Sequence, residues 1–86
     1  MELEGKTLLL SGATGGIGRA IAEELARRGA SLVLSSRKGE ELDSLAQSLP
    51  GGAERHRTLV ADLAEPGAAE ELVDKAGDVD GMVANA

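Results

Sequence analysis

Short continuous apolar runs alternate along this chain with segments whose apolar residues recur at helical spacing. The continuous runs at Thr7–Ser11 and Ser31–Ser36 predict strands that are buried on both faces, and two further strands are predicted at Arg57–Ala61 and Gly81–Ala84. The segments between them predict three amphipathic helices. Their expected apolar faces are Ile17, Ile21, Ala22, Leu25 and Ala26; then Leu42, Leu45, Ala46 and Leu49; then Ala69, Leu72, Val73 and Ala76.

Glycine and proline set the expected helix boundaries. Gly29 is a natural stop for the first helix, and residues 50–52 close the second helix as a loop. Pro66 suits the first turn of the third helix, where its missing N–H costs nothing. On the solvent side of the first helix we expect two i,i+4 ion pairs, Glu23 with Arg27 and Glu24 with Arg28.

The resulting order is strand, helix, strand, helix, strand, helix, strand. Strands separated by helices of this length form right-handed crossovers and a parallel sheet covered on both faces. The sequence therefore predicts an α/β fold in three layers. No repeat or interdomain linker divides the 86 residues, so we treat residues 1–86 as one unit.

Composition narrows the possible functions. The chain has no aromatic residue and no cysteine, so a disulfide, a thiol nucleophile and a thiolate metal site are excluded. Its net charge of -6 makes it a poor partner for nucleic acid or an anionic membrane. No apolar run approaches membrane-spanning length and the N-terminus does not resemble a signal peptide, so we expect a cytoplasmic protein. The single histidine, His56, is not expected to bind a metal or to act in catalysis.

Three glycines occupy the turn between the first strand and the first helix. Three roles are expected for Gly12, Gly16 and Gly18. One glycine allows the sharp turn, one lets a pyrophosphate approach the backbone closely, and one lets the helix pack closely on the strand. The first N–H groups of the helix then point at the anion. The alternative is a glycine turn that serves packing only, but its position at the head of a βαβ unit favours dinucleotide binding.

The spacing Ser11-Gly12-x-x-x-Gly16-Ile17-Gly18 resembles the T-G-x-x-x-G-x-G fingerprint of the short-chain dehydrogenase/reductase family, with Ser11 in place of the usual Thr. "ADL" at residues 61–63 and "DVDGMVANA" at residues 78–86 resemble two further family segments, in the family's order. The resemblance covers the whole chain. It implies the NAD(P)-binding half of a Rossmann-like fold with strand order 3-2-1-4. The short connection from Asp62 to Asn85 is faintly similar to bacterial 3-oxoacyl-[acyl-carrier-protein] reductases.

The end of the second predicted strand bears on the choice of cofactor. A carboxylate there would bind the ribose 2′-OH of NAD, but this chain has Ser36, Arg37 and Lys38, which suit the 2′-phosphate of NADP. We therefore expect NADP(H) to be preferred and NAD(H) to be possible; the alternative is a solvated basic pair at the start of a helix. The resemblance implies these cofactor-binding residues: Gly12, Thr14, Gly16, Ile17, Gly18, Ser36, Arg37, Lys38, Asp62, Leu63, Asn85 and Ala86.

The family's chemistry is hydride transfer between the cofactor and a carbonyl or alcohol. The resemblance implies that a Tyr in Tyr-x-x-x-Lys, together with a Ser, carries out the proton transfer, and this chain has no Tyr. We therefore expect no catalytic residue here. The chain is interpreted as a truncated, inactive, NADP(H)-binding N-terminal portion of an oxidoreductase. The alternative is a stand-alone nucleotide-binding or interaction module.

The family's strand order would leave the fourth strand at an edge of the sheet. Unpaired backbone groups and the apolar Met82 and Val83 would then face water. We expect self-association through the edge at Gly81–Ala84 or through the uncovered sheet face. The alternative is a marginal monomer.

Overall fold

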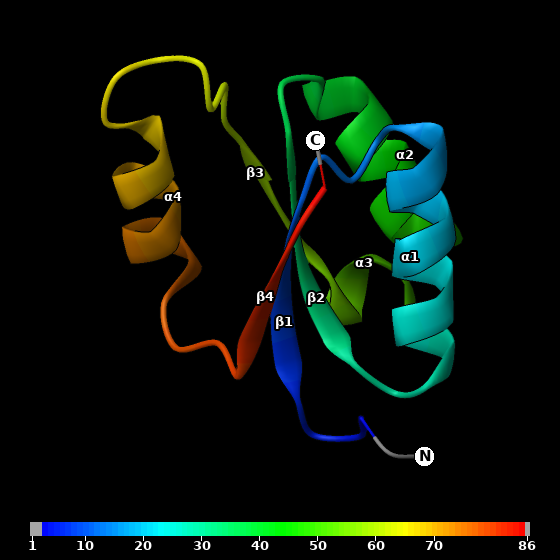
Figure 1. The fold of residues 1–86 in the computed structure, drawn as a ribbon. Helices are drawn as coiled ribbons and strands as arrows, with labels where there is room; N and C mark the ends of the chain where they lie inside the picture. The colour runs from blue at the N-terminus through cyan, green and yellow to red at the C-terminus, as the bar shows by residue number, and fades with distance from the viewer. Residues whose placement is uncertain (1–2, 86) are drawn as a thin grey trace.

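A computed structural model describes residues 3–85 and shows a four-stranded parallel sheet with helices on both faces (Figure 1). The order across the sheet is β3-β2-β1-β4, as predicted. The elements are β1 (Thr7–Ser11), α1 (Gly16–Arg27), β2 (Ser31–Ser36), α2 (Gly39–Ser48), α3 (Gly52–Arg55), β3 (Arg57–Val60), α4 (Ala68–Ala76) and β4 (Gly81–Ala84).

The sheet separates two apolar clusters of unequal size. Because successive side chains of a strand point to opposite faces, Leu10 and Leu34 meet α1 and α2, whereas Leu9 and Val33 meet α4. Figure 1 shows α1 and α2 together on one side of the sheet and α4 by itself on the other. The sheet face covered by α4 is therefore the less protected one.

Three predicted boundaries need correction. Residues 50–52 were expected to form a loop, but Gly52 begins the short helix α3. The third predicted strand ends at Val60, one residue early. Pro66 was expected in the first turn of the last helix, but α4 begins at Ala68, after Gly67 with φ of 79°. Gly67 adopts the left-handed conformation that a residue with a side chain avoids, so the turn extends past the proline.

The apolar face predicted for α4 is only partly correct. Leu72 and Ala76 are buried against the sheet, but Ala69 is exposed and Val73 retains 42% of its accessible surface. A single helix on this face contacts the sheet along one narrow stripe. The outer flank of the predicted apolar face is consequently left in water.

The ion pairs on α1 also differ from those expected. Glu24 forms an ion pair with Arg28 at 2.7 Å, as predicted. Arg27 was expected to pair with Glu23, but it forms an ion pair with Glu24 at 3.0 Å, at i,i+3 spacing. These two arginines hold the pKa of the Glu24 carboxyl below its usual value, chiefly through the hydrogen bond from Arg28. The pairs are exposed, so their contribution to stability is small.

Three consecutive residues, from the end of α3 to the start of β3, join separate parts of the fold. Arg55 donates from its guanidinium to the carbonyl of Ala26, in the last turn of α1, and to that of Ala30, beyond its end. Arg57 donates in the same way to the last carbonyls of α4. Between them, buried His56 accepts from the Leu32 N–H at 3.1 Å and lies 2.7 Å from the Pro50 carbonyl. Burial lowers the pKa of His56, so the neutral ring that serves both partners is favoured.

Candidate functional site

An open groove of about 450 Å³ lies at the carboxyl ends of the strands. It is formed where the segments that follow β1, β2, β3 and β4 come together. Its lining residues are Gly12, Thr14, Gly15, Ser36, Arg37, Lys38, Ala61, Asp62, Leu63, Ala64 and Asn85. In open parallel sheets, ligands bind at this end of the strands, where the order of connection reverses.

The three glycines of the turn meet different constraints. Gly12 has φ of 67°, and a methyl group there would overlap the carbonyl oxygen of Asn85. A methyl group at Gly18 would overlap the carbonyl oxygen of Gly12, so this glycine lets α1 sit close to the turn. Gly16 has an ordinary φ, and a methyl group there would meet no atom of the described chain within 4 Å. The fold therefore explains Gly12 and Gly18 but leaves Gly16 without a structural requirement.

The N-terminus of α1 offers free donors beside the turn. The first N–H groups of a helix lack intrahelical acceptors, and the N-cap residue, Gly15, supplies no side chain to satisfy them. No acidic residue stands in the first turn, in contrast to α2, which has Glu40 and Glu41 there. The turn itself is fixed by the Ala13 N–H, which donates to the Ser35 carbonyl at 3.0 Å. The arrangement suits an anionic ligand.

A basic segment forms the wall of the groove after β2. The Ser36 hydroxyl accepts from the Lys38 N–H at 3.0 Å and so fixes the turn between them. Lys38 is 61% exposed and lies 3.6 Å from Glu41. Within residues 3–85 the structure gives the exposed Arg37 side chain no hydrogen-bond or ion-pair partner. Arg37 is thus available to a ligand with a negative group at this wall.

The opposite wall is formed by the segments after β3 and β4. The Asp62 carboxylate accepts from the Ala64 N–H at 3.0 Å, which shapes the loop, and Leu63 is 47% exposed beside it. Asn85 donates from its side-chain amide to the Gly12 carbonyl at 3.1 Å. Asn85 therefore joins the end of β4 to the glycine turn across the floor of the groove.

The groove gathers most, but not all, of the residues predicted from the sequence. It is lined by Gly12, Thr14, Ser36, Arg37, Lys38, Asp62, Leu63 and Asn85. Gly16 and Gly18 lie at the start of α1 and do not line it, and Ala86 lies outside the described residues.

Ile17 is placed elsewhere. It is 71% exposed and lines a different hollow on the surface of α1, with Ala20, Ile21 and Leu25. Three lining residues, Gly15, Ala61 and Ala64, were missed by the sequence prediction. Glycine and alanine have no functional group that would suggest a binding role. Only their position next to predicted site residues could have indicated that they line the groove.

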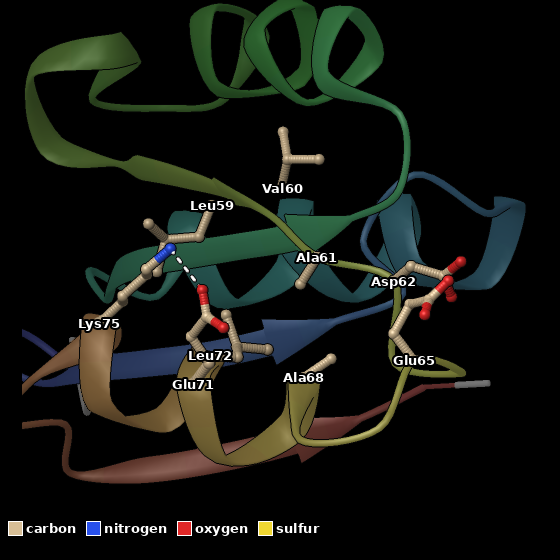
Figure 2. Close-up of a pocket in the computed structure, with 9 residues that line it drawn as sticks. All are labelled: Leu59, Val60, Ala61, Asp62, Glu65, Ala68, Glu71, Leu72 and Lys75. Atoms are coloured by element: carbon tan, nitrogen blue, oxygen red, sulfur yellow. Dashed lines mark ion pairs between the residues drawn. The ribbon is translucent and has the colours of Figure 1, made fainter.

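A second hollow, of about 210 Å³, lies between β3 and α4 and shares Ala61 and Asp62 with the groove (Figure 2). Leu59 and Leu72 give it an apolar floor, and the Lys75 ammonium at its edge is paired with Glu71 at 2.8 Å. Because its one cation is already paired and the carboxylates of Asp62 and Glu65 lie together in the same hollow, an anion is better accommodated in the larger groove.

Two other kinds of site find no support in the described part of the chain. Residues 3–85 contain no group of three or more His, Cys, Asp or Glu side chains that could hold a metal ion. No helix among these residues has the length and apolar character required to cross a bilayer.

Comparison with known proteins agrees with the fold. A family model described as short chain dehydrogenase matches residues 6–86. Oxidoreductase UcpA of Escherichia coli is 38% identical over 82 residues, which are 95% of this chain and 31% of that protein. This chain therefore spans about a third of the length of that relative.

Two solved structures extend the comparison. A 3-oxoacyl (acyl-carrier-protein) reductase from Agrobacterium tumefaciens with NADP bound has a TM-score of 0.88 at 38% identity, over 98% of this chain and 34% of that one. L-Sorbose reductase from Gluconobacter frateurii, complexed with NADPH and L-sorbose, has a TM-score of 0.87 at 34% identity, over 98% and 34% of the two chains.

Proposed function

The chain belongs to the short-chain dehydrogenase family, and from that membership we propose that residues 1–86 are the NADP(H)-binding portion of a carbonyl or alcohol oxidoreductase. The family uses a nicotinamide dinucleotide as its hydride carrier. The 86 residues by themselves bind the cofactor without catalysing hydride transfer. A stand-alone nucleotide-binding module without catalysis is the second candidate, since the groove would serve it equally well.

The observation that carries this proposal is the composition of the groove. A glycine turn, the free N–H groups of a helix, a basic segment and a polar floor all meet at the carboxyl ends of the strands. The turn and the N-terminus of α1 suit a pyrophosphate, because an anion is stabilised there by N–H donors and the helix dipole. Asp62 and Leu63 then suit the adenine, and Asn85 the middle of the cofactor.

The preference for NADP(H) rests on Arg37 and Lys38. Both line the groove after β2, and no acidic residue lines the same wall, although Glu41 lies 3.6 Å from Lys38 beside it. A guanidinium can bind a phosphate through two parallel hydrogen bonds, and a nearby ammonium adds charge. Both solved relatives named above contain an NADP cofactor, which agrees with this preference.

Replacing Arg37 by Ala is expected to weaken NADPH binding by about tenfold or more and to leave NADH binding nearly unchanged. Charge-assisted hydrogen bonds contribute roughly 1.5–3 kcal/mol, and only NADPH carries the 2′-phosphate that receives them. Titration calorimetry with both cofactors measures the difference. Arg27→Ala is the matched control, because Arg27 lies at the other end of α1, away from the groove. Equal affinity of the wild-type chain for both cofactors would rule out the assignment of Arg37.

We further propose that the chain associates with a second copy through β4. In the described sheet β4 pairs with β1 on one side, and its other edge carries no strand. Met82 is 59% exposed on the face that α4 covers, whereas Val83 is partly buried against the α1 and α2 cluster. Two copies related by a two-fold axis would pair these edges in antiparallel fashion and cover both Met82 side chains.

Substituting Met82 by Lys is expected to weaken this association at least tenfold, because it places like charges next to each other at the two-fold axis. Sedimentation equilibrium over a concentration series measures the change. Val60→Lys is the control, since Val60 is 63% exposed on β3 at the opposite edge of the sheet. A wild-type chain that stays monomeric at high concentration, or equal effects of the two substitutions, would contradict pairing through β4.

A further inference from the structure

One carboxylate lies beside the basic segment that lines the groove. Glu41, in the first turn of α2, has its Oε1 atom 3.6 Å from the Arg19 guanidinium and its Oε2 atom 3.6 Å from the Lys38 ammonium. The two oxygens serve different cations, so one carboxylate holds both at once. Figure 1 shows that the N-terminal ends of α1 and α2, which carry these residues, lie at the same end of the sheet.

Both cations are placed where a phosphate at the groove would meet them. Lys38 lines the groove, and Arg19 donates from Nε to the carbonyl of Thr14, another lining residue, at 3.2 Å. Arg19 is thereby fixed at the rim of the glycine turn, opposite the basic segment. Together with Arg37, these residues form a basic rim at the adenosine end of the groove.

The contacts of Glu41 are loose enough to be exchanged. Hydrogen-bonded ion pairs have N···O distances of about 2.7–2.9 Å, so separations of 3.6 Å are electrostatic contacts without a well-formed hydrogen bond. The side chains are 39%, 45% and 61% exposed for Arg19, Glu41 and Lys38. A phosphate dianion, with more charge and three acceptor oxygens, can replace such a carboxylate.

We propose that Glu41 is a specificity-determining residue of this groove. It pairs with Arg19 and Lys38 while the groove is empty, and it competes with the 2′-phosphate for them; this inference rests on the proposed NADP(H) site. Glu41 also stands in the first turn of α2, where the helix dipole stabilises an anion, so it repels a phosphate that approaches the same position. The preference for NADP(H) over NAD(H) is consequently smaller than the basic residues alone would give.

The test compares Glu41→Gln with the wild-type chain, using 2′,5′-ADP and 5′-AMP as ligands. These two probes share the adenosine and the 5′-phosphate and differ only in the 2′-phosphate. Glu41→Gln is expected to strengthen 2′,5′-ADP binding about three- to tenfold, since each exposed ion pair that is released is worth up to about fivefold. Binding of 5′-AMP should change less than twofold. The gain should shrink as salt is raised.

Glu40→Gln is the matched control, because it removes the same charge from the neighbouring, exposed position of α2. No ion pair of Glu40 is present in the described part of the chain, so its substitution releases neither cation. A change below twofold is expected for both probes. Glu41→Ala should behave like Glu41→Gln, which shows that the lost charge, and not the new amide, is responsible.

The inference is overturned if Glu41→Gln and Glu40→Gln have equal effects, or if Glu41→Gln weakens 2′,5′-ADP binding. The Arg37→Ala variant distinguishes a failure of the role proposed for Glu41 from a failure of the proposed NADP(H) site. If Arg37→Ala reduces the preference for 2′,5′-ADP while Glu41→Gln does nothing, the NADP(H) site stands and the role of Glu41 is wrong. If the wild-type chain does not distinguish the two probes, both proposals fail together.

Discussion

The 86-residue chain incubated with NADPH and a panel of ketones and aldehydes is expected to leave the NADPH absorbance unchanged. Reduction transfers a hydride from NADPH to the carbonyl carbon, and a proton must be added to the carbonyl oxygen. In the family the proton donor is a tyrosine, and this chain has no Tyr. General acid catalysis is worth ~10²–10⁴-fold, so a chain that lacks the donor should give no rate above background.

A complete reductase added to the same mixture provides the control, because it shows that the cofactor and substrates are competent. The chain must also be folded in the assay, which circular dichroism establishes. NADPH consumption that depends on this chain and survives repurification would show that another group supplies the proton.

Substituting Gly18 by Ala is expected to lower the midpoint of thermal unfolding by about 4–24 °C. The added methyl group would overlap the Gly12 carbonyl and press on the backbone of Ala13, which is buried. Overpacking of this kind costs about 1–3 kcal/mol, and 1 kcal/mol shifts the midpoint of a small domain by about 4–8 °C. The measurement is a thermal melt followed by circular dichroism.

Gly16→Ala provides a matched control in the same helix. Its methyl group would meet no atom within 4 Å, and replacing a helical glycine stabilises a helix by up to about 1 kcal/mol. The variant should therefore melt at the wild-type temperature or a few degrees higher. Equal melting of the two variants would refute the distinction drawn between these glycines.

The strands were the most predictable part of this fold. β1, β2 and β4 have the predicted boundaries, because each is a short, largely apolar run between turn residues. The wrong helix boundaries lie where the local sequence gives only a weak indication of a helix. α3 has only four residues and starts at a glycine, and the start of α4 depends on the left-handed Gly67. Val73 was assigned to the apolar face of α4, but its exposure shows that coverage depends on the neighbouring elements.

The groove could be predicted as far as its residues belong to a recognisable pattern. The glycine turn and the basic segment were identified because their chemistry is visible in the sequence, and Asp62 was identified through the family resemblance. The pairing of Glu41 with both Arg19 and Lys38 was not, because it joins α1 to α2 through tertiary packing. Burial of His56 between Leu32 and Pro50 has the same origin. Spacing along the chain does not encode such contacts.

The central claim is that the groove at the carboxyl ends of the strands binds a nicotinamide dinucleotide through its glycine turn and basic segment. Backbone amide chemical shifts of the isotope-labelled chain, recorded by NMR during titration with NADPH, test it most directly. We expect the largest shifts at residues 12–18, 36–38 and 62–63 and at Asn85, with little change in the hollow between β3 and α4. Saturating NADPH that leaves these amides unperturbed, or that shifts Leu59, Leu72 and Lys75 in their place, would contradict the account.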